Sequence, residues 1–401
     1  MKPLENIRVL DFTRVLAGPT CTRILAELGA QVTKVEPPSG DIGRMAAPQI
    51  QGQSAYYLQL NGGKRNLSID LNWPEAREAA LKLCHKADVI VENFRPGTMK
   101  TFGLDYESVR EQNPAVVYVS MSGFGQNTPW STRPAFAPTV QAESGATQTQ
   151  MDHFGDDLLQ PVTDWASHAD VYTGLEGAIA VLAGLNKRNA TGTGLHGDVS
   201  MMATMLAVNE RLHAQINELD AADEPLALGA PESPIFKVAD GSFVTIAASP
   251  ISSGVFMRYC GMMGRNDLRT DSRFATPALR RKNLKALLSE VQNWMRSFRS
   301  FEELEYQVSG AGGLAVGKVR TAADLLETDW AQSADPTYTS LVGDLEIRLP
   351  KGPWLFNGRD SGALSAAAPR GANNHEVLSE AGFDDATIKA WEDAGILSSD
   401  L

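Results

Sequence analysis

The chain has 401 residues, of which 43% are hydrophobic and 21% charged, as expected of a globular protein with a large buried core. Its net charge of −12 argues against a surface for nucleic acid or for an anionic membrane, because both need clustered basic residues. The three cysteines and six histidines are scattered, so we predict no disulfide framework, no metal site and a cytoplasmic location. The longest apolar run, at 178–185, is far shorter than the roughly 20 residues of a membrane span, and no signal-peptide core precedes the first predicted strand.

The first part of the chain alternates predicted strands and helices. Residues 7–12 have the pattern of a buried strand, a helix follows the Gly18-Pro19 pair, and 31–36 form a second strand. Helices are then predicted at 74–86 and 106–112, and strands at 88–92 and 115–120. This alternation predicts a doubly wound α/β domain around a parallel sheet.

A further helix is predicted to begin at Asp170. The residues that repeat at three and four positions, and so predict one buried helix face, are Val171, Leu175, Ala178, Ile179, Leu182 and Leu185. At the helix start the dipole favours an ionised Asp170 carboxylate. That carboxylate is either an N-cap or a nucleophile or base, and the helix pattern alone leaves both interpretations open.

The second half of the chain does not continue the regular alternation of strands and helices. A short strand at 196–199 and a long helix at 201–219 lead into a polar linker at 221–233. Two apolar runs flank Asp240-Gly241 and predict a β-hairpin, and helices are predicted at 251–263, 279–298 and 302–309. We therefore predict a smaller α+β domain at 234–325. A strand pair after Pro336 and helices at 375–381 and 385–394 complete the chain.

Several loops stand where a parallel sheet binds ligands, beyond the carboxyl ends of its strands. The loop at 13–19 could present amides to an anion, but it lacks the GxGxxG pattern of a dinucleotide site. Lys64-Arg65 on a glycine turn could hold phosphates or be a solvated loop. The loop at 92–97 is a candidate ligand contact, and the glycines at 123 and 125 suggest either a lid or a plain turn. No GxSxG, P-loop or HExxH motif is present.

The ordered set of motifs resembles the class III coenzyme A transferases, also called the formyl-CoA transferase or CaiB–BaiF family. The motifs run over nearly the whole chain and are Val9-Leu10-Asp11-Phe12-Thr13 with Ala17-Gly18-Pro19, Lys64-Arg65, Ala87-Asp88-Val89, Glu92-Asn93-Phe94-Arg95-Pro96-Gly97, Ser122-Gly123-Phe124-Gly125-Gln126, Ala169-Asp170 with Thr173-Gly174, Asp198-Val199-Ser200-Met201, Asp240-Gly241 and Asn374-His375-Glu376-Val377-Leu378. Each motif alone is weak, and their order carries the resemblance.

The resemblance implies an interlocked homodimer in which each chain threads the ring formed by the other. It implies a large domain built from 1–220 and 326–401, with the small domain inserted. Asp170 matches the family's catalytic aspartate, which moves CoA from an acyl-CoA to a free carboxylic acid through a mixed anhydride and an aspartyl-CoA thioester. Coenzyme A is then part of the substrates, and no cofactor is permanently bound. By family position the CoA-binding residues are Val15, Leu16, Ala17, Ile69, Asp70, Leu71, Asn72, Asn93, Phe94, Arg95 and Lys100.

Some positions depart from the formyl-CoA transferase pattern. Pro37 and Thr101 stand where that pattern has phosphate-binding arginines, so Lys100, Arg44 or Arg95 would have to compensate. The glycine-rich loop of oxalate-specific members is replaced by residues 229–232, which argues against formyl-CoA and oxalate as the substrate pair.

Three other functions remain open at this level. An α-methylacyl-CoA racemase of the same superfamily needs a pair of bases, but Phe136-Ala137 stands where the His-Asp step is expected, and 247–250 lacks the acid of the small domain. An NAD-dependent dehydrogenase is weakened by the missing glycine pattern. A CoA-binding protein without activity is weakened by the presence of Asp170.

Overall fold

The computed structural model describes residues 2–148, 166–210, 212–217 and 235–400. The chain divides into two compact units, a large unit of Met1–Asn209 with Asp335–Leu401 and a small unit of Glu210–Ala334. The large unit therefore contains both ends of the chain. The segment predicted as a small domain, 234–325, falls within the small unit, and the linker predicted at 221–233 lies outside the described residues.

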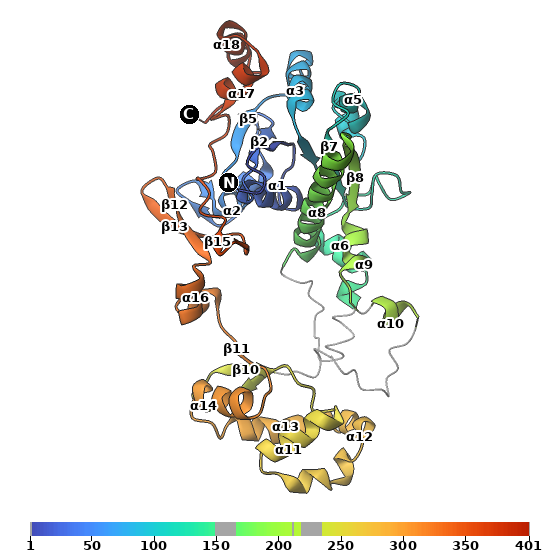
Figure 1. The fold of residues 1–401 in the computed structure, drawn as a ribbon, viewed down its shortest axis with the longest axis vertical. Helices are drawn as coiled ribbons and strands as arrows, with labels where there is room; N and C mark the ends of the chain where they lie inside the picture. Colours follow the sequence, from blue (N-terminus) through green and yellow to red (C-terminus); the bar gives the residue numbers. More distant parts are fainter. Residues whose placement is uncertain (1, 149–165, 211, 218–234, 401) are drawn as a thin grey trace. The chain divides into compact units, whose positions relative to one another are not determined.

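A six-stranded parallel sheet forms the centre of the large unit (Figure 1). Its strands, in spatial order, are β5 (Arg65–Ser68), β2 (Gln31–Glu36), β1 (Arg8–Asp11), β6 (Val89–Glu92), β7 (Val117–Ser122) and β8 (Leu195–Ser200). All five neighbouring pairs are parallel, which confirms the predicted α/β class. The chain builds outward from β1 in one direction and from β6 in the other, so the loops after these two strands diverge at the place where such sheets bind ligands.

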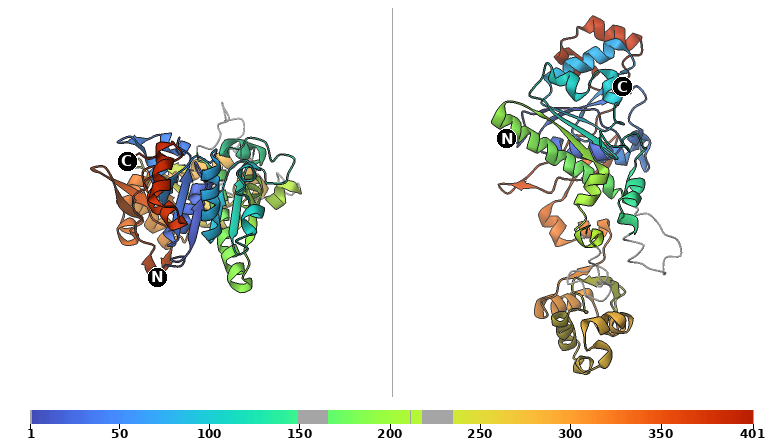
Figure 2. Two further views of the ribbon diagram at one scale, coloured as in Figure 1. Left: turned by 90° about the horizontal axis from the view of Figure 1, so that it is seen from above. Right: turned by 90° about the vertical axis from the view of Figure 1, so that its right-hand side faces the viewer.

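Alternate residues of the strands face opposite layers of helices. Val9, Val89 and Val117 pack with α1 (Ala17–Glu27) and α8 (His168–Thr191), which lie side by side on one face (Figure 2). Leu10, Ile90 and Tyr118 belong to the core of the other face. The helices of that face are α3 (Pro74–Lys86), α4 (Thr98–Phe102), α5 (Tyr106–Arg110), α17 (Asn374–Ala381) and α18 (Asp385–Asp393).

The C-terminal segment is tied to the N-terminal half of the sheet by side-chain amides. The Oδ1 atoms of Asn373 and Asn374 accept hydrogen bonds from the backbone amides of Asn66 and Ser68, at 2.9 and 2.8 Å. The remaining elements of the large unit are η1 (Ile42–Met45), β3 (Gln49–Ile50), β4 (Gln53–Ser54), α2 (Ala55–Asn61), α6 (Ala137–Glu143), α9 (Met201–Ala207), β12 (Thr337–Val342), β13 (Leu345–Pro350), β14 (Leu355–Phe356) and β15 (Arg359–Asp360). The antiparallel pairing of β12 with β13 confirms the strand pair predicted after Pro336.

The small unit is an α+β assembly with its own apolar core. β9 (Ile235–Lys237) and β10 (Phe243–Ile246) form the predicted hairpin, with Gly241 at a φ of 90° in the turn. The other elements of this unit are α10 (Leu212–Ile216), α11 (Ser253–Met262), η4 (Asn266–Arg269), η5 (Ser272–Phe274), α12 (Pro277–Lys282), α13 (Leu284–Met295), α14 (Phe301–Glu305), η6 (Tyr306–Ala311), β11 (Val316–Lys318), α15 (Ala322–Leu326) and α16 (Asp329–Ala334). Two predicted long helices are wrong. The helix predicted at 201–219 ends at Ala207, and the helix predicted at 279–298 is divided at Asn283 into α12 and α13.

The buried face of α8 differs from the prediction. Val171, Leu175, Ile179 and Leu182 are 36, 43, 56 and 40% exposed, so in the single chain they do not form the buried stripe. Of the predicted stripe only Ala178 and Leu185 are buried. The buried positions are mainly small, and they are Ala169, Thr173, Gly174, Gly177, Ala178, Val181, Gly184 and Leu185. A Cβ at Gly174 would lie 2.6 Å from the carbonyl oxygen of Ala17, so this glycine lets α8 approach the start of α1 closely.

Candidate active site

A cavity of about 340 Å³ opens at the carboxyl edge of the sheet, beside the loops that follow β1 and β6. Most of its lining comes from four places: the loop after β1, the loop after β6, the segment from Met121 to Pro138, and the start of α8. Ile42, Tyr56 and Met201 complete it. Asp170 is the only acidic residue of the described lining, and no histidine belongs to it.

Asp170 lies in the first turn of α8, which begins two residues earlier than predicted. Its carboxylate accepts hydrogen bonds from the backbone N–H groups of Ala17 and Ala137, the first residues of α1 and α6. The N-cap interpretation is therefore wrong, because the cap residue of α8 is Ser167 and the amides that bind Asp170 belong to two other helices.

Burial raises the pKa of Asp170 to about 6, although both amide hydrogen bonds act in the opposite direction. The carboxylate is thus mainly ionised at neutral pH and more basic than an ordinary aspartate. Tyr56 also lines the cavity, and burial together with the charges of Asp170 and Asp41 raises its pKa to about 12. Tyr56 therefore keeps its proton at neutral pH and can act there only as a neutral hydroxyl.

The titration of Asp170 predicts a pH dependence of activity. Because a nucleophilic carboxylate must be ionised, we expect kcat/KM to be constant above about pH 6.5 and to fall about tenfold per pH unit below about pH 5.5. The measurement is a pH profile of donor kcat/KM, with CoA affinity measured at each pH to separate protonation of the CoA phosphates. A rate that stayed constant down to pH 4.5 would contradict the raised pKa.

The loop after β1 is fixed by contacts on both sides. Val15 has a φ of 67°, an unusual conformation for a β-branched residue, and its N–H donates to both oxygens of Asp41 at 3.0 and 3.1 Å. Asn93, after β6, accepts from the N–H of Arg14 at 2.9 Å and donates to its carbonyl at 3.0 Å. These bonds join the two loops that border the cavity and hold the start of α1 beside Asp170.

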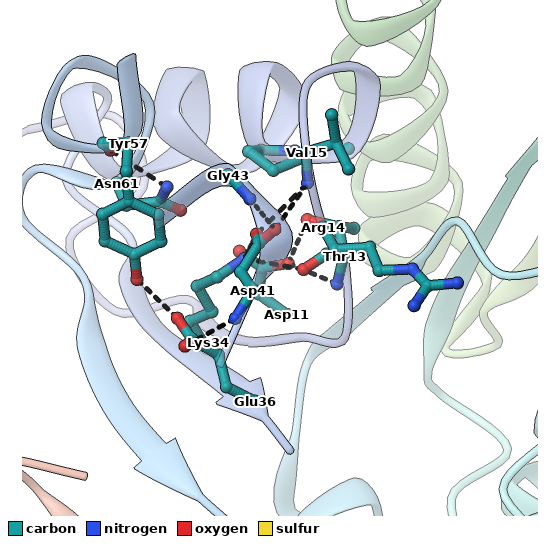
Figure 3. Close-up of polar contacts among 12 residues, drawn as sticks. Asp11, Thr13, Arg14, Val15, Lys34, Glu36, Asp41, Gly43, Tyr57 and Asn61 are labelled. Atoms are coloured by element: carbon teal, nitrogen blue, oxygen red, sulfur yellow. Dashed lines mark hydrogen bonds and ion pairs between the residues drawn. The ribbon is translucent and has the colours of Figure 1, made fainter. Parts of the chain in front are cut away.

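Two buried lysines contact residues of this loop and of β1. Figure 3 shows one of them, Lys34, beside Asp41. The Lys34 ammonium contacts Asp41 at 3.0 Å and donates to the carbonyl of Thr13 at 2.6 Å. The Lys64 ammonium contacts Asp11 at 3.1 Å, and its further partners are Thr22 at 2.8 Å and Asn61 at 2.8 Å. Burial opposes ionisation of Asp11, but Lys64, Lys34 and two hydroxyl hydrogen bonds together hold the pKa of Asp11 below its usual value.

These contacts correct two predictions. Lys64 is neither a phosphate ligand nor part of a solvated loop, because it is buried and fully engaged, and burial lowers its pKa to about 8. Its neighbour Arg65 pairs with Glu376 and Glu380 at 3.2 and 2.9 Å. Arg44 does not compensate for the missing phosphate-binding arginines, since its guanidinium is bound to Glu36 at 2.8 Å and to Tyr57 at 2.6 Å.

The acid at the end of β6 was placed in the candidate ligand loop at 92–97 from sequence, but its burial was not predicted. Glu92 is 4% exposed, its Oε2 accepts from the N–H of Phe94 at 2.9 Å, and burial raises its pKa to about 7. The neighbouring strand supplies Ser120, whose hydroxyl also bonds Glu92 and lies 2.9 Å from Nε2 of His196. An acid that closes a buried strand was the available signal for this burial.

The residues predicted to bind CoA fall into two groups. Six of them line the cavity, and they are Val15, Leu16, Ala17, Asn93, Phe94 and Arg95. Ile69, Asp70, Leu71, Asn72 and Lys100 lie outside this lining. Ile69 is buried and pairs with Leu397, and Asp70 accepts from the N–H of Asn72 at 3.0 Å. For both groups the CoA contact stays a prediction.

The predicted lid at Gly123 is closely packed in this structure. A Cβ at Gly123 would lie 2.0 Å from the Cβ of Ala135, and Phe124 is buried. The residues at 229–232, which replace the glycine-rich loop, lie outside the described part of the chain. Within the described residues, no group of three or more His, Cys, Asp or Glu could hold a metal ion, and no helix is long and apolar enough to cross a bilayer.

The chain belongs to CoA-transferase family III, whose model matches residues 4–374. It is a class III CoA-transferase, which confirms the resemblance seen in the sequence motifs. The succinyl-CoA:mesaconate CoA-transferase of Haloarcula hispanica is 34% identical over 341 residues, covering 82% of this chain and 83% of that protein. Human succinyl-CoA:glutarate CoA-transferase is 34% identical over 300 residues, covering 72% of this chain and 66% of that protein.

Solved structures agree with the fold. The crystal structure of Rv3272 from Mycobacterium tuberculosis matches with a TM-score of 0.80 and 29% identity, covering 94% of this chain and 99% of that one. A CaiB/BaiF family protein from Brucella suis matches with a TM-score of 0.78 and 28% identity, covering 95% of this chain and 99% of that one.

Proposed function

We propose that the protein moves coenzyme A from an acyl-CoA to a free carboxylic acid, with Asp170 as the nucleophile. The observation that carries this proposal is the position of Asp170, a largely buried carboxylate of raised pKa, held by two amides in a cavity at the ligand edge of the sheet. A free carboxylate is a weak nucleophile in water, but one held close to a thioester carbonyl gains from proximity and lost hydration.

The proposed reaction has two matched halves. An oxygen of Asp170 attacks the thioester carbonyl and expels CoA thiolate, which leaves a mixed anhydride between Asp170 and the acyl group. The thiolate then attacks the aspartyl carbonyl, which releases the donor acid and leaves an aspartyl-CoA thioester. The acceptor carboxylate attacks that thioester, and the expelled thiolate finally takes the acceptor acyl group and frees Asp170.

Two features of the site support these steps. The N–H groups of Ala17 and Ala137 already bind the Asp170 carboxylate, so they are placed to donate to the oxyanion that forms when the aspartyl carbonyl is attacked. Each intermediate reacts with water, and the cavity walls of Phe94, Met121 and Phe136 supply apolar surface against it. We propose that the loops at 15–17 and 93–95 hold CoA, with Ile69 to Asn72 and Lys100 at its outer part.

A racemase has no support from this geometry. Racemisation at an α-carbon needs two groups that exchange a proton, whereas Asp170 is the only carboxylate or imidazole in the described lining. The substrates named for the relatives, succinyl-CoA with mesaconate or glutarate, each carry a further carboxylate. We propose dicarboxylic acids and their CoA thioesters as candidate substrates here.

The test is a screen of acyl-CoA donors against free acids, followed by intact-mass analysis of the protein. We expect CoA transfer for at least one pair and a CoA adduct that peptide mapping places on Asp170. Transfer without any such adduct, or an adduct on another residue, would remove Asp170 from the proposed role.

We also propose that the protein is an interlocked homodimer. Its support is the exposed apolar row on α8, formed by Val171, Leu175, Ile179 and Leu182, since single chains rarely leave such a row uncovered. We expect light scattering to give twice the 43.2 kDa mass of the chain at micromolar concentration. Replacing Ile179 with aspartate should lower the measured mass, whereas the same change at Glu176, a polar and partly exposed residue of that helix, should not. A parent protein with the mass of one chain would contradict the dimer.

A further inference from the structure

The cavity contains positive charge that the described residues do not neutralise. Three arginines line it, Arg14, Arg95 and Arg133. Arg133 pairs with Glu143 and lies over the ring of Trp130 at 4.3 Å. Among the described residues, no carboxylate lies within 4.0 Å of the guanidinium of Arg14 or Arg95, unlike Arg133. The lining therefore offers two cations to an anionic ligand beside a single acid, Asp170.

Arg14 is the better placed of the two to contact the reacting group. It lies on the same loop as Ala17, whose amide binds Asp170, and the intervening chain spans at most roughly 10 Å. Both its backbone N–H and its carbonyl are bonded to Asn93, and its guanidinium lies 5.1 Å from the ring centroid of Phe94. Figure 3 shows the guanidinium pointing away from the buried lysine network, while the backbone beside it is held by Asp41. The backbone of Arg14 is thus fixed, while the charge of its exposed side chain is available to a ligand.

We infer that Arg14 binds the free carboxylate of a dicarboxylic acyl group whose other carboxyl carries CoA or receives it. The inference rests on the proposed CoA transfer through Asp170 and assigns its acyl specificity to one residue. A guanidinium presents a planar fork of N–H donors that matches a carboxylate in two parallel hydrogen bonds. Because Arg14 lies in the loop after β1 and Asp170 in the first turn of α8, the two ends of one short acyl chain would be held by separate segments of the large unit.

A phosphate of CoA is the other anion that a guanidinium could bind, and the two sources make different predictions. A carboxylate ligand ties Arg14 to the acyl group, so its loss affects only donors with a second carboxylate. A phosphate ligand ties Arg14 to the CoA moiety, so its loss affects all donors alike. In a double-displacement reaction, kcat/KM for the donor reports the first half-reaction alone, so the acceptor does not confuse this comparison.

The experiment compares matched donors with the full-length protein and its Arg14→Gln and Arg14→Lys variants. Succinyl-CoA and glutaryl-CoA are each paired with the methyl-ended thioester of the same length, butyryl-CoA or valeryl-CoA. For Arg14→Gln we expect the dicarboxylic donor's kcat/KM to fall by about 10- to 100-fold, mainly through KM, because a charge-assisted hydrogen bond contributes about 1.5–3 kcal/mol. The methyl-ended donor should change by less than about threefold. Arg14→Lys should keep part of the preference, since it keeps the charge and loses the fork.

The control is Arg110→Gln, an exposed arginine on α5 outside the cavity lining, which should leave both donors unchanged. An equal fall for both members of a pair would overturn the inference and assign Arg14 to CoA phosphate. No fall for either donor, or a parent enzyme that does not prefer the dicarboxylic donor, would overturn it as well. Failure of the proposed function looks different, because then the parent transfers CoA from no donor and forms no adduct on Asp170.

Discussion

Asp170→Asn is expected to lower transferase turnover by at least about 10⁴-fold while CoA affinity changes by less than about threefold. The amide keeps the shape of the side chain and an oxygen that accepts from Ala17 and Ala137, but it cannot attack a thioester. Turnover is measured with the best donor and acceptor pair of the parent, and CoA affinity by calorimetry. Glu176→Gln, a change at a partly exposed residue of the same helix outside the cavity lining, serves as the control and should retain full activity.

The same variant should be more stable than the parent above pH 6. The folded pKa of Asp170, about 6, exceeds the ordinary value of 3.8, so the ionised carboxylate destabilises the folded state. This penalty is absent below pH 3.8, grows as the pH rises toward 6 and is constant above it. We expect Asp170→Asn to raise the free energy of unfolding by on the order of 1–2 kcal/mol at pH 8 and by nearly nothing at pH 4.

Either of two results would contradict this account. Turnover within tenfold of the parent would show that Asp170 is not the nucleophile. Lower stability at pH 8 would show that its carboxylate is held more favourably than its burial indicates.

The sequence predicted the parallel sheet well because its information is local. Short apolar runs ending in turn residues mark β1, β2, β6 and β7, and helical periodicity marks the helices between them. β5 was not predicted as a strand, because Arg65-Asn66 at its start has a polar pattern. Those two side chains bond to Glu380 and Glu36, which are distant in sequence, so no local signal could show that they belong to a strand.

In the candidate site, too, the residues could be found from sequence motifs, but the contacts between distant segments could not. Asp170 and the loops at 15–17 and 93–95 were found through ordered motifs, and the structure brings all of them to one cavity. What the sequence could not show is which atoms meet. The Ala137 amide comes from a helix that begins 33 positions before Asp170. The face of α8 that approaches α1 includes Gly174 and Gly177, and glycines carry no hydrophobic signal.

Charge was interpreted least well from sequence. Lysines are rarely buried, so Lys64 was expected against a phosphate or in a solvated loop, and the burial of Lys34 was not predicted. Burial of each is possible because an aspartate from another segment lies within about 3 Å, Asp41 for Lys34 and Asp11 for Lys64. A buried charge without a partner strongly destabilises the folded state, so removing either lysine should have a large effect on stability.

Lys34→Met should lower the free energy of unfolding by about 3–5 kcal/mol, with a fall in Tm on the order of 10 °C. The ammonium is buried between Asp41 and the Thr13 carbonyl, and its removal leaves the Asp41 charge buried without its counter-ion. Because Asp41 also holds the N–H of Val15, we expect the loop after β1 to loosen and kcat to fall in protein that remains folded. Chemical denaturation followed by tryptophan fluorescence measures the first effect, and donor kinetics at 15 °C the second.

Combining Lys34→Met with Asp41→Asn separates the charge from the hydrogen bonds. The double variant has no unpaired carboxylate at position 41, while the amide oxygen that replaces it can still accept from Val15, so it should recover at least about 1 kcal/mol relative to Lys34→Met alone. Lys82→Met, which removes an exposed ion pair with Glu78, is the matched control and should change stability by less than about 0.5 kcal/mol. If Lys34→Met unfolded within 1 kcal/mol of the parent, the buried pair would not be what holds this loop, and the geometry of the Ala17 amide at Asp170 would need another cause.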